Sequence, residues 1–478
     1  MPRPIVLIHG YSAEGLDFKP LCERFSQPGN PAIDLNIGNY VSLNNEITIK
    51  DIAEGFDRAL RNNSKLDKDQ EFDAIVHSTG MLVIRCWLTN YGAAVGNNSR
   101  LKRLKHLVGL APATWGSPQA HKGRTWIGAL VKGDKEPGPD FLNAGDEVLD
   151  GLELGSRFTW DLAHLDLLGK TPYYGAGADT PYVCVFIGNT HYTGIASVAN
   201  DPGTDGTVRW AGCGLNTRKI SMDLTRTPVG ADGQSASRVS MSPWAGRVDI
   251  PMIAVEGKNH ATLISAPEDG MVKRILSFLE IDQQAAYEDW VKEAKEYGAE
   301  PLKKMLVNPG KGAAGLPGEV KAFFGHLFHN AEQEMEGWQQ FVVRMRDERG
   351  DPVTDYLIDV LRKQDGKWVE FMEMYADVHA YGSDASFRCF HIRLPIGITK
   401  EPLRVRITAS TGTKLMAYQG YGSDDDGKTM KADAEPVVID LDTGEGTLFY
   451  PFTTTLVELI VNREPSPLDK VSDIFKFL

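Results

Sequence analysis

Ser78 lies between a short apolar run and a segment whose apolar residues have helix-like spacing, and this position could make it a nucleophile. The run 72–76 has the length of a buried strand, and apolar residues recur with helical spacing from residue 80 onward. A serine pinned at a strand-to-helix turn is exposed at the end of a sheet, where the N–H of Thr79 and the helix N-terminus can stabilise negative charge. The pattern Val76-His77-Ser78-Thr79-Gly80 departs from the usual Gly-x-Ser-x-Gly in its first residue, so a simple Ser-Thr-Gly helix cap is the alternative interpretation.

A histidine and an aspartate that could complete a catalytic triad lie in later loops. His260 comes shortly after the apolar run 251–255. Asp205 lies in the loop that follows the run 181–187, where the neighbouring glycine permits a sharp turn. Asp201 is a rival for the acid, although an aspartate directly before a proline is more typical of a turn.

A parallel sheet would bring these three residues together. Short apolar strands are expected at 4–8, 32–37, 72–76, 104–110, 181–187 and 251–255, and they alternate with helical segments such as 48–62. This alternation predicts an α/β fold whose mostly parallel sheet is covered by helices on both faces. Ligands of such sheets bind beyond the carboxyl ends of the strands. Ser78 falls at such an end, and the loops with Asp205 and His260 follow two others.

Five pieces in this order resemble the α/β-hydrolase superfamily, and within it the bacterial lipase/esterase group. They span roughly residues 1–279 and comprise Val6-Leu7-Ile8-His9-Gly10-Tyr11, Val76-His77-Ser78-Thr79-Gly80, Ala111-Pro112 with Gly116-Ser117-Pro118, Asp205-Gly206-Thr207-Val208, and Asn259-His260. The order of serine, aspartate and histidine is the one that α/β-hydrolases use. The resemblance implies an oxyanion hole formed by the backbone N–H groups of Tyr11 and Thr79. It also implies ester hydrolysis through an acyl-enzyme on Ser78, with no metal and no organic cofactor.

The segment 115–180 has the size and composition of a cap or lid inserted in the hydrolase domain. Its apolar and aromatic residues, with Trp115 and Trp126 as candidates for substrate binding, favour medium- to long-chain acyl groups over charged acids. The segment could be a mobile lid or a permanently packed cap, and we favour the cap. A helix is expected from Leu152 to Leu168.

Composition limits the possible partners. The 478 residues carry a net charge of −13, which argues against a general nucleic-acid or anionic-membrane binder. Five scattered cysteines without Cys-x-x-Cys spacing indicate neither a disulfide framework nor a zinc site, and the run 424–426 of aspartates is expected in a hairpin turn rather than around calcium. No signal peptide and no apolar run of about 18 residues is visible, so a cytoplasmic location is the default expectation, with signal-independent secretion as the alternative. The expected partner is an acyl-ester or lipid substrate, with possible transient contact with a lipid interface.

The organisation changes after the hydrolase domain, which is expected to span residues 1–307. A charged helix is expected at 283–300, and the Gly- and Pro-rich stretch 308–318 is expected to be a linker. Short β-rich segments then predict an antiparallel β-sandwich over 319–478. Two other functions remain open: a catalytically silent hydrolase fold that acts as a binding module, and an acyltransferase that uses the same triad.

Overall fold

The computed structural model describes residues 3–8, 19–26, 33–35, 47–62, 66, 70–92, 100–123, 146–175, 180–193, 200–227, 238–242, 250–307, 335–398, 402–413, 415–423, 430–431, 436–441 and 448–465. The chain forms two compact units. The first comprises Met1–Thr217 and Trp244–Glu332, and the second comprises Arg218–Pro243 and Gln333–Leu478.

The first unit is built on a parallel sheet of six strands in the order β2-β1-β3-β4-β5-β8. The strands are β1 (Ile5–Ile8), β2 (Ile33–Leu35), β3 (Phe72–His77), β4 (Leu104–Leu110), β5 (Tyr182–Gly188) and β8 (Met252–Val255). Their residues are apolar and almost wholly buried because helices cover both faces. The predicted fold class is therefore confirmed, and all six predicted strands occur at the expected places.

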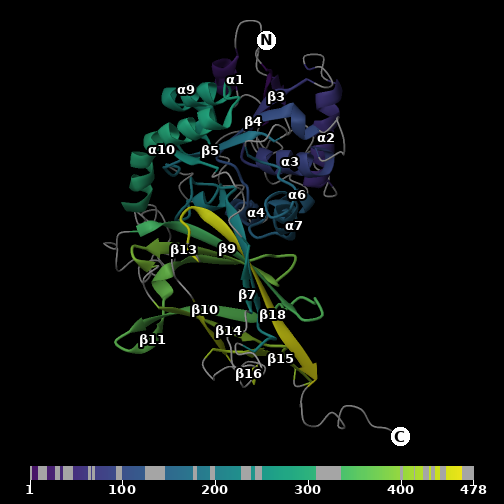
Figure 1. The fold of residues 1–478 in the computed structure, drawn as a ribbon, viewed down its shortest axis with the longest axis vertical. Helices are drawn as coiled ribbons and strands as arrows, with labels where there is room; N and C mark the ends of the chain where they lie inside the picture. The colour runs from purple at the N-terminus through teal and green to yellow at the C-terminus, as the bar shows by residue number, and fades with distance from the viewer. Residues whose placement is uncertain are drawn as a thin grey trace. The chain divides into compact units, whose positions relative to one another are not determined.

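Helices pack on the two faces in two groups (Figure 1). One group contains α1 (Lys19–Phe25), α9 (Asp269–Phe278) and α10 (Gln284–Val307), whose apolar side chains share a core with those of the strands. The other contains α2 (Ile49–Asn62), α3 (Gly80–Trp87), α6 (Asp146–Leu152) and α7 (Arg157–Asp166). Two short helices, α4 (Pro118–Gly123) and α8 (Thr262–Ser265), are also described in this unit. None of the described helices is both long and apolar enough to cross a bilayer.

Two predicted helices differ from the observed ones. The helix expected at Leu152–Leu168 is split into α6 and α7, because Gly155 adopts a φ of 65° and Ser156 then caps α7 by accepting a hydrogen bond from the Thr159 amide at 3.2 Å. The helix expected at 283–300 continues as α10 through Pro301 to Val307.

The second unit is a sandwich of two sheets that share one apolar core. The smaller sheet has the order β11-β10-β14-β17, formed by β10 (Tyr356–Gln364), β11 (Lys367–Glu370), β14 (Leu403–Ala409) and β17 (Val437–Leu441). The larger sheet contains β6 (Thr217–Asp223), β7 (Val239–Met241), β9 (Met335–Asp347), β12 (Tyr375–Ala380), β13 (Phe387–Pro395), β15 (Met416–Tyr421), β16 (Met430–Lys431) and β18 (Thr453–Pro465). The predicted sandwich is thus confirmed.

Two features of the second unit differ from the expectation. Its strands are not all antiparallel, since β18 runs parallel to β9 with Leu456 opposite Val342. The larger sheet also takes β6 and β7 from the middle of the chain, so that Arg218–Pro243 belongs to the second unit although the predicted hydrolase domain runs unbroken to residue 307. The predicted linker 308–318 lies outside the described residues.

Candidate active site

Ser78 occupies a strained turn between β3 and α3. Its φ is 52°, a left-handed conformation that costs a residue with a Cβ about 1–2 kcal/mol. Hydrogen bonds to neighbouring loops hold the turn: the Ser78 amide donates to the Leu110 carbonyl at 3.2 Å, and the Ser78 carbonyl accepts from the Ala113 amide at 3.0 Å. The Ser78 side chain is partly exposed between buried neighbours. This is the geometry of a nucleophile elbow.

Two glycines make room for this turn. A Cβ on Gly80 would lie 2.7 Å from the backbone oxygen of Ile8, so only glycine lets the start of α3 approach β1 this closely. On the next strand, Gly109 pairs with Val76, and a Cβ there would lie 2.8 Å from the methyl group of Met81. The small residue beside the elbow is therefore Gly109 of β4. In the usual Gly-x-Ser-x-Gly pattern, the small residue is instead a glycine at the position that Val76 occupies here.

Asp205 and His260 form a hydrogen-bonded pair. His260 Nδ1 donates to a carboxylate oxygen of Asp205 at 3.0 Å, and the His260 amide donates to the Asp205 carbonyl at 3.1 Å. The other carboxylate oxygen of Asp205 accepts from the amides of Thr207 and Val208 at 3.0 and 2.8 Å. Asp205 is completely buried and His260 nearly so. The carboxylate is thus positioned to fix the tautomer of the imidazole.

Water has little access to Asp205. Burial raises the pKa of the Cys213 thiol well above its ordinary value, and the negative charge of Asp205 raises it further. Gly206 adopts a φ of 98°, and a Cβ there would lie 2.5 Å from the ring of Tyr192. The sharp turn that the sequence indicated after Asp205 is therefore formed.

The rival Asp201 is half-buried, and its carbonyl accepts from the Thr204 hydroxyl at 2.7 Å.

His77 links the elbow to the histidine loop. Its Nε2 donates to the carbonyl oxygen of His260 at 3.1 Å, and the centroids of the two imidazole rings lie 4.6 Å apart. Because His77 directly precedes Ser78, this bond connects the loop that carries the candidate base to the turn that carries the candidate nucleophile. The loop is also held by Asn259, whose side-chain oxygen accepts from the Thr262 amide at 3.0 Å.

Of the remaining predicted site residues, the structure describes Thr79 and Trp115. Thr79 is buried and directly precedes α3. Trp115 is completely buried, and its indole N–H donates to the Gly214 carbonyl at 3.0 Å, so its side chain is held in the interior of the first unit. Tyr11 and Trp126 lie outside the described residues.

A buried ion pair next to the elbow was not predicted. Arg85 on α3 forms two parallel hydrogen bonds to Asp166 at the end of α7, at 2.8 and 2.9 Å, and both side chains have no exposed surface. A third bond runs from Arg85 to the Thr114 carbonyl at 2.7 Å, and the Tyr174 hydroxyl donates to Asp166 at 2.6 Å. Burial by itself would lower the pKa of Arg85, but the charge of Asp166 and the hydrogen bonds to it raise that pKa overall. A charged residue inside the otherwise apolar run 80–87 was the sequence signal for this pair.

Together the six-stranded sheet, the elbow and the placement of Asp205 and His260 after late strands define an α/β-hydrolase fold. Among solved structures, the chain is similar to phospholipase PlaB from Legionella pneumophila, with a TM-score of 0.71 and 20% identity over 100% of this chain and 96% of that chain. The structure of PlaB in complex with thio-NAD gives a TM-score of 0.70 and 21% identity over the same shares.

A weaker likeness, with a TM-score of 0.36 and 13% identity over 59% of this chain and 93% of that chain, is to the mature form of lipase BlEst2 from Bacillus licheniformis. Neither protein-family models nor curated proteins match the sequence. The predicted resemblance is confirmed at the level of the fold, and the full-length likeness to PlaB includes the second, β-rich unit.

Proposed function

We propose that the protein is a serine carboxylic-ester hydrolase with Ser78 as nucleophile, His260 as base and Asp205 as the acid that orients the base. The observation that carries the proposal is the positive φ of Ser78 at a strand-to-helix turn, since such strain persists where the surrounding structure holds it and is concentrated at functional sites. The buried pair of Asp205 and His260 and the bond from His77 to His260 support the same assignment.

In the proposed reaction, His260 removes the proton of the Ser78 hydroxyl as its oxygen attacks the ester carbonyl. Asp205 stabilises the imidazolium that forms and remains ionised. The amides of Tyr11 and Thr79 donate to the oxyanion, a contribution worth about 10²–10³ in rate per donor. His260 then gives its proton to the leaving alcohol, and water repeats the sequence on the acyl-enzyme to release the acid. The proton transfers involve only Ser78, His260, the alcohol and water, so the proposed reaction needs neither a metal nor an organic cofactor.

The proposed substrates are acyl esters of lipids with medium to long chains. The structural relative PlaB is a phospholipase, and the proposed cap is rich in apolar and aromatic residues, Trp126 among them, that suit hydrocarbon chains. Trp115, being completely buried, would support the packing of this cap rather than touch the chain. The tie between Arg85 and Asp166 anchors α7 to the elbow helix, which favours a packed cap for this part of the insertion over a mobile lid.

Ser78→Ala tests the proposal. This variant should lose p-nitrophenyl ester hydrolysis and labelling by a fluorophosphonate probe while it keeps the circular dichroism of the wild type. Ser265→Ala is the matched control, because Ser265 is an exposed serine in the same unit and its loss should leave both signals unchanged. Wild-type protein that fails to react with the probe would favour the silent-fold alternative. Transfer of the acyl group to an added alcohol in preference to water would favour the acyltransferase.

A further inference from the structure

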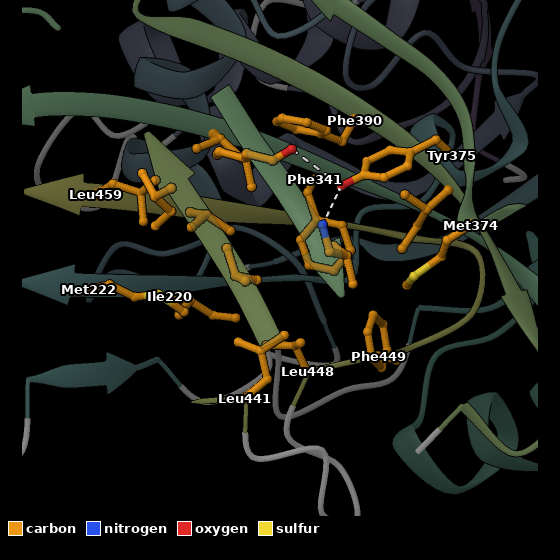
Figure 2. A pocket seen from close by; sticks show the side chains of 17 residues that line it. Ile220, Met222, Phe341, Met374, Tyr375, Phe390, Leu441, Leu448, Phe449 and Leu459 are labelled. Atoms are coloured by element: carbon orange, nitrogen blue, oxygen red, sulfur yellow. Dashed lines mark hydrogen bonds between the residues drawn. The ribbon is translucent and has the colours of Figure 1, made fainter. Parts of the chain in front are cut away.

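The core of the second unit contains a cavity of about 100 Å³ between its two sheets (Figure 2). Both inner faces contribute pairs of residues two positions apart along a strand, as the alternation of side chains in a strand requires. The larger sheet provides pairs from β6, β9, β13 and β18, and the smaller sheet provides pairs from β10 and β14. The other described lining residues are Met374, Tyr375, Leu441, Leu448 and Phe449.

The lining is not packed closed. Phe341, Ile358, Val405 and Phe449 are among its large apolar side chains that are only half-buried, whereas the inner face of a closed sandwich would bury such residues fully. The described part of this lining is therefore still in contact with solvent. An apolar ligand that binds here leaves water, which lowers its free energy.

Among the described lining residues, no polar group is left for a ligand. Tyr375 contributes the hydroxyl in the lining, and this hydroxyl already accepts from the Val360 amide at 2.9 Å and donates to the Ile358 carbonyl at 3.3 Å (Figure 2). The other lining side chains are aliphatic, aromatic or methionine. A water molecule needs two to four polar partners to remain in a cavity, so this space favours hydrocarbon.

We propose that the cavity binds the end of one unbranched hydrocarbon chain, as found in fatty acids, fatty alcohols and lipid acyl groups. An engineered apolar cavity of about 150 Å³ binds benzene, a ring of six carbons. The smaller volume here suits the end of a linear chain better than a ring, and the remainder of the chain extends out of the cavity. Met222 and Met374 line the space, and their flexible thioether side chains can adapt to such a ligand. This site lies in the second unit and does not depend on the proposed chemistry at Ser78.

The direct test uses the full chain with ¹³C-labelled methionine methyl groups and 1-octanol as the probe, below its aggregation limit. The methyl resonances of Met222 and Met374, assigned by substitution with leucine, should shift in a saturable manner. Met345 is the internal control, since it is buried in the same core but does not line the cavity, and its resonance should stay in place. If neither lining methionine shifts up to the solubility limit of octanol, or if only methionines of the first unit shift, the proposal is overturned.

Two further properties follow from the lining. Because the described lining residues include no cation, 1-octanol and octanoate should bind within about threefold of one another. A strong preference for the carboxylate would contradict a purely apolar site. In a series of 1-alkanols, each added methylene that enters the cavity should raise the affinity about fourfold, with a plateau once the cavity is full.

A matched pair of variants places the binding in the cavity. Ile358 points into the cavity, and Leu357 lies beside it on β10 with 59% of its surface exposed, so the two residues face opposite sides of the strand. Ile358→Phe should fill the space and weaken octanol binding at least tenfold, and Leu357→Phe should leave it unchanged. Equal effects of the two variants would mean that octanol binds elsewhere. If Ile358→Phe does not fold, the methionine shifts of the wild type still decide the proposal.

Discussion

The ion pair of Arg85 and Asp166 gives a prediction whose size follows from burial. Asp166→Leu would leave the Arg85 guanidinium completely buried with the Thr114 carbonyl as a hydrogen-bond acceptor but with no counter-charge from Asp166. Breaking one side of a buried pair costs about 3–5 kcal/mol of unfolding free energy. Such a loss is a large part of the 5–15 kcal/mol that stabilises an ordinary domain.

Removing both charges should cost less than removing one. In the double variant Arg85→Met/Asp166→Leu, the Tyr174 hydroxyl loses its acceptor, which costs about 1–3 kcal/mol, but no charge stays buried. The additional change Tyr174→Phe should bring the stability closer to that of the wild type. The exposed pair of Arg157 and Asp161 on α7, 3.7 Å apart, is the control, and its removal should change stability by less than about 0.5 kcal/mol.

The assay is urea unfolding combined with hydrogen exchange of peptides from α3 and α7. The exchange data assign the loss to the first unit, because a chain with two units need not unfold in one step. In the single variant, the protection of both helices should decrease together. The reasoning would be refuted if Asp166→Leu cost less than about 1 kcal/mol, or if the double variant were less stable than the single one.

Three further predictions concern the proposed site. Asp205→Asn should lower kcat by up to about 10⁴ because the imidazole loses its correct tautomer, while Asp201→Asn should have a mild effect; the reverse pattern would make Asp201 the acid. Gly80→Ala would place a Cβ 2.7 Å from the Ile8 oxygen, so urea unfolding should show a loss of about 1–3 kcal/mol, and an unchanged midpoint would contradict this close approach. In a p-nitrophenyl ester series, kcat/KM should rise from acetate to medium chains, because each added methylene can stabilise the transition state by up to ~0.8 kcal/mol. A steady fall of kcat/KM from acetate would indicate a small closed site.

The sequence was most informative where one local pattern determines the structure. Buried parallel strands appear as continuous apolar runs, so the six strands of the first unit were predicted from periodicity and length. The turns at Ser78 and Asp205 were predicted because each has a glycine close by, at Gly80 and Gly206, and the structure explains both glycines by close approach.

Long-range features were not accessible in the same way. Gly109 lies in an apolar strand, and its role as the small residue beside the elbow becomes visible only when β4 is placed next to β3. Arg85 could be noticed as an odd charge in an apolar helix, but its partner Asp166 lies 81 positions away. The membership of β6 in the second unit has no local signal at all, because pairing between distant strands leaves no short-range pattern.

The pairing of β6 with β18 has a consequence for how the protein is made. The two strands, Thr217–Asp223 and Thr453–Pro465, leave the ribosome far apart in time. At synthesis rates of roughly 5–20 residues per second, β6 must wait on the order of 10–50 s for its partner. During this delay Ile220 and Met222, both buried in the finished protein, have no sandwich core to enter. A shortened chain that ends after α10 would keep β6, with Ile220 and Met222 on the face that lacks its core, and should need a chaperone or aggregate. The first unit is therefore a poor choice for separate expression.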